Sequence, residues 1–323
     1  MEPDDSSATP AEGALETADD LSQPGNRAEA AADVGSDEKP SSHKTYATIL
    51  DQEIREGVDE LERPARGLFL SGVSAGLDIG FSVLAIGVLS SLMGDEASAL
   101  MRTTVLANAY TIGFILVIFG RSELFTEHTT LAVLPLLDGR TTGGRVARAW
   151  CLIYVGNLVG VAIFSAVLSL AGPALGSVQP RVLDVAAAHL VDPSWWVILL
   201  SAVLAGWLMG LVSWLVTAGR DTTSQILFVW LVTGLIGLAG LHHCILGSGE
   251  VLSAVFMGAS IPLGACLHFL LFATLGNAIG GFFFVAIVKY GHASVVRPGL
   301  RDPLTWHHEG GEGGCLRRER GSE

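Results

Sequence analysis

The chain has 323 residues, of which 50% are hydrophobic. It contains several apolar runs of about 18 residues or more, each long enough to cross a bilayer as a helix, so the composition excludes a soluble globular protein. The net charge of −13 comes entirely from residues 1–62, which hold 17 acidic and 4 basic side chains, whereas the remainder holds 15 of each. No basic stretch predicts nucleic-acid binding.

The first 62 residues form two predicted segments. Residues 1–45 are rich in Ala, Asp, Glu, Ser, Gly and Pro, so they cannot bury enough apolar surface to offset the entropy of ordering. We expect a disordered acidic cytoplasmic tail, and no cleaved signal peptide is predicted. Residues 46–62 are predicted to be an amphipathic surface helix, because apolar residues recur at helical spacing. These are Leu50, Ile54, Val58 and Leu61.

Six membrane spans are predicted between residues 63 and 290, followed by a cytoplasmic C-terminal tail, 291–323. The approximate bounds of the spans are 67–93, 103–137, 146–171, 194–217, 223–258 and 262–289. The second and fifth are too long for one crossing of about 30 Å and carry polar residues in the middle, so each is predicted to be two half-helices joined by a loop.

Basic residues predict the orientation of the spans. They concentrate before the first span and after the second, fourth and sixth, which places both termini in the cytoplasm. The residues are Arg63, Arg66, Arg140, Arg145, Arg148, Arg220, Lys289 and Arg297, against only Arg102 and Arg181 in the alternate loops.

An internal repeat relates the first three spans (67–171) to the last three (194–289). The motif Gly156-Asn157-x-x-Gly160 recurs 120 residues later as Gly276-Asn277-x-x-Gly280. The same offset pairs Gly120 with Gly240 and Glu123 with His243. Because three is odd, the second copy is predicted to be inverted, as in channels and transporters whose solute site lies at the midplane. The small residues favour close helix packing, and each Asn can tie a broken helix end to its neighbour.

The polar residues of the two breaks are the candidate site. Residues 240–250 hold two histidines, a serine and Glu250, and such groups cannot face lipid, so they should line a cavity. For His243 the alternative is that the ring only pins the loop. For Glu123 a role in fixing the loop is equally open.

Three other functions compete with transport. A membrane enzyme or metal site is not expected, because adjacent histidines do not share a helix face and no His-Glu-x-x-His spacing occurs. We therefore expect no enzyme activity, metal or cofactor. A neutral-solute channel would suit the broken-helix arrangement, although twin Asn-Pro-Ala motifs are absent. A non-transporting sensor or scaffold, acting through the acidic tail, stays a further alternative.

Four motifs together resemble the formate/nitrite transporter family. The second-span motif Gly-x-Asp-Leu-Phe-Thr is similar to the stretch ending in Glu123-Leu124-Phe125-Thr126. The third-span motif Tyr-x-Gly-Asn-Leu-x-Gly matches 154–160, and the last-span motif Gly-Asn-x-x-Gly-Gly matches 276–281. The fifth-span motif Gly-Phe-Glu-His-Ser-Ile resembles 240–245.

The resemblance implies an all-α, aquaporin-like fold and a homopentamer in the plasma (inner) membrane, with one pore per protomer. It implies passage of small monovalent anions such as formate or nitrite, often linked to protons. It puts the central pore histidine on His243, facing Thr126, and puts Leu124 and Phe125 in an apolar constriction. The weaker candidates for gating or pore wall are Tyr110, Phe114, Ile236, Gly210 and Gly247. An outer-loop basic residue of the family falls on His189.

The chain departs from the family pattern at three positions. The Glu before the central histidine is His242 here, an Asn four residues after it is Gly247, and a fourth-span Asn is Gly210. An anion in an apolar constriction loses hydration worth far more than one hydrogen bond, unless it takes a proton. The sequence therefore predicts that Thr126 and His243 orient a weak-acid anion and leaves its identity open.

Overall fold

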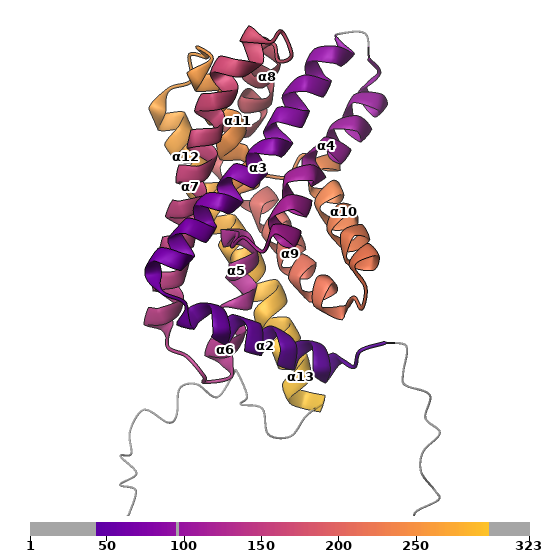
Figure 1. Ribbon diagram of the computed structural model, residues 1–323, viewed down its shortest axis with the longest axis vertical. Coiled ribbons are helices and arrows are strands. Elements are labelled where there is room, and N and C mark those ends of the chain that lie inside the picture. The colour runs from indigo at the N-terminus through magenta and orange to yellow at the C-terminus, as the bar shows by residue number, and fades with distance from the viewer. Residues whose placement is uncertain (1–42, 95–96, 297–323) are drawn as a thin grey trace, which may run out of the picture. The chain divides into compact units, whose positions relative to one another are not determined.

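The computed structural model describes residues 43–94 and 97–296, and all regular secondary structure in these ranges is helical (Figure 1). The elements are α2 (Tyr46–Glu62), α3 (Ala65–Met93), α4 (Ala99–Gly120), α5 (Phe125–Leu131), α6 (Leu134–Leu137), α7 (Gly143–Ala174), α8 (Pro180–Val191), α9 (Trp195–Ala218), α10 (Thr222–Leu238), α11 (Cys244–Phe256), α12 (Leu263–Ile279), η2 (Gly280–Ile287) and α13 (Val288–Val296). The predicted tails, 1–45 and 291–323, lie mostly outside the described residues, except that α13 continues to Val296.

Five helical segments are long and apolar enough to cross a membrane: α3, α4, α7, α9 and the continuous run Leu263–His292. α10 and α11 are shorter apolar helices. Many large apolar side chains on these helices are exposed, among them Leu170 (77%) and Leu263 (73%), as expected where lipid replaces water. The protein is therefore an integral membrane protein that crosses the bilayer several times. The second predicted span is broken after Gly120, near the predicted position, and its first part, α4, has 22 residues, about 33 Å of helix.

Glycines let two helix pairs approach closely, α3 with α7 and α9 with α12. A Cβ added to Gly76 would lie 2.2 Å from the Asn157 carbonyl oxygen, and one on Gly160 would lie 2.1 Å from the Val73 oxygen. A Cβ on Gly206 would lie 2.1 Å from the Asn277 oxygen. The backbones touch at these places, so no larger residue fits without moving a helix. Close contacts of the same kind occur at Gly156, Gly276 and Gly280.

The chain leaves helical structure at two places, after α4 and after α10, and it does so in the same way. Arg121 (φ 57°) and Gly240 (φ 60°) both adopt the left-handed conformation that ends a helix. The next residue then donates back into the preceding helix, Ser122 N–H to the Val117 oxygen (3.1 Å) and Leu241 N–H to the Ile236 oxygen (3.0 Å).

Two buried asparagines hold the loops that follow. Asn157 Oδ1 accepts from Phe125 N–H (2.8 Å), and its amide donates to the oxygens of Glu123 and Gly72 (both 2.9 Å). Asn277 repeats the pattern with Cys244 N–H (2.8 Å) and the oxygens of His242 (3.0 Å) and Ala202 (2.8 Å).

These contacts correct the predicted register of the two loops. Glu123 corresponds to His242 and Leu124 to His243, an offset of 119 rather than 120. The pairing of Gly120 with Gly240 is wrong for the same reason, because Arg121 takes the position that Gly240 has in the second loop. The two Gly-Asn motifs are 120 residues apart, whereas the corresponding loop residues that they bind are 119 residues apart.

Two elements were not predicted from the sequence. α8 forms within the loop between α7 and α9 and packs on α11, at the end of the bundle opposite α2 (Figure 1). η2 is a π-helical stretch that continues α12. The apolar face of α2 packs on α5, α6 and α9 rather than on lipid, and Leu50, Ile54 and Leu61 are buried there.

Candidate functional site

The hydroxyl of Thr126 and the imidazole of His243 meet where the two loops converge. Thr126 lies in the first turn of α5, and His243 is the N-cap of α11. Thr126 Oγ1 and His243 Nε2 are 2.9 Å apart, and both residues are almost completely buried. His243 Nδ1 accepts from Leu246 N–H at 3.2 Å. The proton of the neutral ring therefore sits on Nε2 and is donated to Thr126, which leaves the Thr126 hydroxyl proton available to another acceptor.

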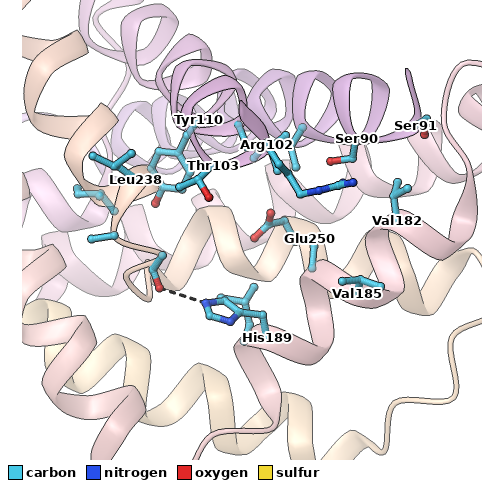
Figure 2. A pocket seen from close by; sticks show the side chains of 18 of the residues that line it. Ser90, Ser91, Arg102, Thr103, Tyr110, Val182, Val185, His189, Leu238 and Glu250 are labelled. Carbon is cyan, nitrogen blue, oxygen red and sulfur yellow. Dashed lines mark hydrogen bonds between the residues drawn. The ribbon is translucent and has the colours of Figure 1, made fainter. Parts of the chain in front are cut away.

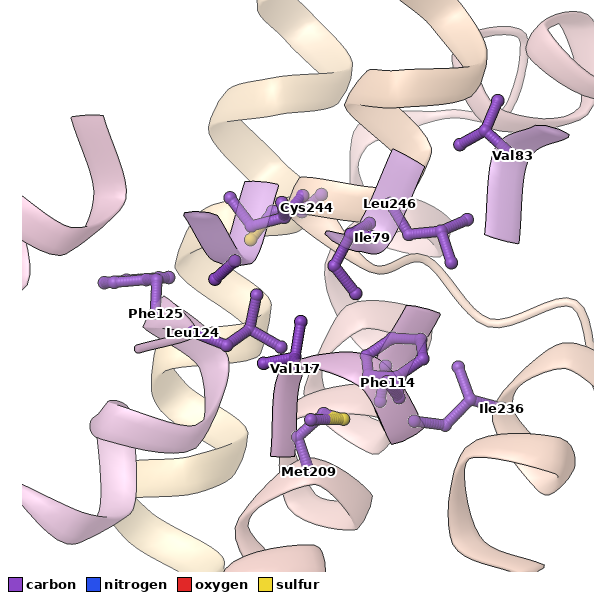
Figure 3. Close-up of a cluster of buried hydrophobic side chains, with 14 of the residues drawn as sticks. Ile79, Val83, Phe114, Val117, Leu124, Phe125, Met209, Ile236, Cys244 and Leu246 are labelled. Atoms are coloured by element: carbon purple, nitrogen blue, oxygen red, sulfur yellow. The ribbon is translucent and has the colours of Figure 1, made fainter. Parts of the chain in front are cut away.

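Apolar side chains enclose this pair. The ring of Phe114 meets His243 edge-on, with centroids 5.1 Å apart, and stacks on Tyr110 at 5.3 Å. Figure 3 shows Phe114, Val117 and Leu124 in the cluster that contains Ile236. Phe114, Val117, Leu124 and Ile236 are each 0% exposed. The imidazole of His243 thus packs on Phe114, which belongs to an apolar cluster whose side chains cannot replace water as hydrogen-bond partners.

Two cavities approach the pair from opposite ends of the bundle. The α8-side cavity has a volume of about 720 Å³ and is lined by Tyr110, Ile236 and Leu241, among others. The α2-side cavity has about 940 Å³ and is lined by Ile118, Ser122 and further residues. Tyr110 and Ile118 are eight residues apart on α4, so the closed segment between the cavities is about 12 Å long. Phe114 and Val117 lie within that segment, together with the Thr126–His243 pair.

The polar groups of the α2-side cavity are mostly held by other protein groups. The Glu123 carboxylate accepts hydrogen bonds from Arg63 and from Ser71, and the Ser122 hydroxyl donates to Asp78 Oδ2 at 2.9 Å. The Glu123 carboxylate is therefore already bonded to two protein groups, which favours the loop-fixing role over a pore role. In the second loop, the Ser201 hydroxyl accepts from His242 N–H at 3.0 Å and lies 2.9 Å from Nδ1 of that residue.

A further ion pair links α2 to the loop region. Glu60 of α2 contacts His128 Nε2, and Nδ1 of the same ring lies 3.0 Å from the Leu124 oxygen. Glu53 of α2 is fully buried and accepts hydrogen bonds from Ser213 and Thr217 of α9. Burial raises the pKa of the Glu53 carboxyl from 4.5 to about 7, although hydrogen bonds from Thr217 and Ser213 oppose the shift.

The α8-side cavity contains His189, the residue on which the family resemblance puts a basic outer-loop position. Its Nε2 lies 3.4 Å from the Gly240 oxygen, and its ring stacks on His242 at 6.0 Å. Figure 2 shows Tyr110 and Glu250 pointing into this cavity from opposite walls, with Arg102 nearby.

Three predicted pore residues have other surroundings. The ring of Phe125 meets Tyr154 and Trp150 of α7, at 4.9 and 6.1 Å, so its contacts are with a neighbouring helix. A Cβ on Gly210 would lie 2.4 Å from Thr130 Oγ1, and one on Gly247 would lie 2.6 Å from Phe269 Cζ. Both glycines fill helix contacts, and neither is among the residues that line the two large cavities.

Sequence reasoning missed Val117 and Arg63, whereas Glu250 is among the polar residues that it expected to line a cavity. Val117 was detectable, because it follows Phe114 by three residues on one helix. Arg63 and Glu123 are 60 residues apart, and no local pattern relates them. Within the described ranges, no group of three His, Cys, Asp or Glu side chains is placed to hold a metal ion.

Apolar helices, two polar loops inside the bundle and a closed segment between opposed cavities define a membrane channel or transporter. The chain belongs to the formate/nitrite transporter family, whose model matches residues 47–291. This confirms the resemblance that the motifs indicated, and the family consists of transporters and channels rather than enzymes.

Known membrane proteins resemble the chain in sequence and in fold. The inner membrane protein YfdC of Escherichia coli (strain K12) is 31% identical over 249 residues, 76% of this chain and 78% of that protein. The structure of an FNT family ion channel matches with a TM-score of 0.69 at 24% identity, over 76% of this chain and 98% of that one. The structure of a pentameric formate channel with formate bound matches with a TM-score of 0.61 at 21% identity, over 72% and 98%.

Proposed function

We propose that the protein conducts small monovalent anions of weak acids, such as formate or nitrite, through a pore in each protomer. The path runs from one cavity to the other past Thr126 and His243. The observation that carries the proposal is the buried 2.9 Å contact between these two side chains, in the closed segment between the cavities. Leu124, Phe114 and Ile236 form the apolar walls of that segment.

The chemistry of the segment favours a solute that can share a proton. A bare anion in an apolar constriction loses hydration worth tens of kcal/mol at low dielectric. The Thr126 hydroxyl can donate one hydrogen bond, and the N-terminus of α11 adds a positive potential of roughly half an elementary charge. Protonation of the solute removes the remaining cost, so transport is linked to protons.

The assembly and orientation belong to the same proposal. The matched contacts of Asn157 and Asn277 support six spans arranged as two inverted repeats. The basic residues of the α2 end support cytoplasmic termini, with the α8-side cavity open to the outside. A homopentamer is supported by the exposed apolar helix surfaces and by the pentameric structure that shares the fold.

The test is formate and nitrite flux into proteoliposomes over a pH series, with assembly checked by pentamer mass. We compare the native protein with His243→Ala and with His268→Ala, a matched loss of imidazole on α12 whose ring packs on Phe272. Native flux that depends on pH, is lost in His243→Ala and is kept in His268→Ala supports the proposal. Assembled native protein that passes neither anion, but passes water or glycerol, contradicts it and assigns the pore to a neutral solute.

A further inference from the structure

The α8-side cavity holds a carboxyl group that an anion path does not need. Glu250 is the one acidic side chain among the described residues that line it. It follows His243 by seven residues, about two turns, so both lie on the same face of α11, with Glu250 about 10 Å further along. A solute that enters this cavity must therefore pass Glu250 before it reaches His243.

Neither Glu250 nor the phenol opposite it has a protein partner. Glu250 makes no hydrogen bond or ion pair with any residue in the described part of the chain. The Tyr110 hydroxyl is buried without a hydrogen-bond partner there, and the residue is 7% exposed. Gly237 makes room for this ring, because a Cβ on it would lie 2.8 Å from Tyr110 Cβ. A buried phenol without a partner is costly, so its persistence points to a ligand.

Tyr110 and Glu250 offer one donor and one group that can hold a proton. A small oxoacid of the form HO–X=O has one oxygen that can accept the Tyr110 hydrogen bond and one oxygen that can share a proton with Glu250. The groups of the solute are therefore complementary to those of the protein. An anion that never takes a proton meets only repulsion from an ionised Glu250, since like charges repel strongly where little water screens them. Such a pair of groups would favour anions of weak acids over anions of strong acids.

We propose that Tyr110 and Glu250 form a binding site for a small weak oxoacid at the entrance to the closed segment. The Tyr110 hydroxyl donates to one solute oxygen, and a single proton lies between the other solute oxygen and the Glu250 carboxyl. When the solute moves on as the neutral acid, the Glu250 O–H bond breaks and the solute O–H bond forms. Glu250 is left as a carboxylate and regains a proton from water in the cavity.

The basic groups of the cavity attract anions that approach it and are not part of the Tyr110–Glu250 site. Arg102 of α4 donates to the Gly94 oxygen, and Arg181 and His189 lie on α8. α3 contributes only the hydroxyls of Ser90 and Ser91 as polar side chains to this wall. The basic groups raise the local anion concentration, whereas Glu250 selects the anions that can carry a proton.

The inference rests on the proposed function, and its test separates binding from flux. Infrared difference spectra are recorded on membranes while buffer alternates between nitrate and nitrite, anions of a strong and a weak acid with no carboxyl band of their own. We compare the native protein with Glu250→Gln and with Asp184→Asn, a matched loss of an exposed acid on α8 outside this cavity. We expect a carboxyl C=O change on nitrite that is absent in Glu250→Gln and kept in Asp184→Asn.

Flux gives the second measurement on the same proteins. We expect the nitrite-to-nitrate flux ratio to fall about tenfold in Glu250→Gln. In Tyr110→Phe we expect this ratio to stay unchanged and the affinity for nitrite to fall. An infrared change that survives in Glu250→Gln, or a flux ratio equal in native protein and Glu250→Gln, overturns the inference. If the infrared change depends on Glu250 but neither anion crosses the membrane, the site stands and the proposed conduction fails.

Discussion

Thr126 and His243 lie 117 residues apart in sequence, yet their buried side chains meet at 2.9 Å. The backbone N–H of Leu246 occupies the other ring nitrogen. The imidazole therefore donates to Thr126, and the proton of the hydroxyl is the polar group that this pair presents to a solute.

Thr126→Val tests that hydroxyl, with Thr126→Ser as the matched control. Valine keeps the shape but leaves the buried His243 N–H unpaired, which costs about 1–3 kcal/mol. We expect lower thermal stability and formate flux reduced by about tenfold or more in Thr126→Val, and near-native values in Thr126→Ser. The measurements are thermal unfolding in detergent and flux in proteoliposomes. Equal flux in the two variants would show that the hydroxyl is not used.

Asn157→Ala and Asn277→Ala test the supports of the two loops. Each asparagine makes three buried hydrogen bonds, so each variant leaves backbone groups unpaired. We expect each to destabilise the protein by about 3 kcal/mol, because a buried unsatisfied group costs about 1–3 kcal/mol. Thermal unfolding monitored by size-exclusion chromatography checks this. For comparison, Asn108→Ala removes an exposed asparagine of α4 whose Oδ1 accepts from Trp230 Nε1 at 3.0 Å, so it should cost only about 1 kcal/mol.

Gly210→Ala and Gly247→Ala test whether side chains fit at these positions. The added Cβ would meet Thr130 at 2.4 Å and Phe269 at 2.6 Å. We expect each to lose about 1–3 kcal/mol, the usual cost of overpacking. Gly264→Ala on α12, where nothing lies within 4 Å, should instead gain about 0.5–1 kcal/mol from helix propensity. Phe269→Leu should rescue Gly247→Ala but not Gly210→Ala, and rescue of both would contradict the local clash.

Glu53 predicts how docking of α2 depends on pH. Burial raises its pKa from 4.5 to about 7, so the neutral form is the one that suits the docked helix. Its contribution to stability is complete below about pH 4.5 and is lost as the pH rises through about 7. We expect hydrogen-exchange protection of α2, corrected for intrinsic rates, to fall about tenfold or more from pH 5 to pH 8.

The charge-neutral variant Glu53→Gln should remove this pH dependence, because glutamine cannot titrate. Glu62→Gln, at the exposed end of the same helix, should leave it unchanged. A pH dependence that persists in Glu53→Gln would mean that another group controls the docking of α2.

Local patterns predicted much of this protein because hydrophobic length and glycine spacing act within a single helix. They placed the apolar segments, the two interruptions and the Gly-Asn motifs, and they brought Thr126 and His243 together through family resemblance. They gave a register between the two loops that is wrong by one residue. Glu123 was paired with His243, but the hydrogen bonds of Asn157 and Asn277 pair it with His242.

The membrane class, the family and the residues of the central pair could be read from the amino-acid sequence, because they follow from composition and from short motifs. Which polar groups are already hydrogen-bonded became visible only in the folded protein. Glu123 is held by Arg63 and Ser71, and Glu53 by two hydroxyls of α9, whereas Glu250 and Tyr110 face a cavity and have no hydrogen-bond partner in the part of the chain that the structure describes. Such pairings join residues far apart in the chain, and they depend on how helices pack rather than on any local spacing.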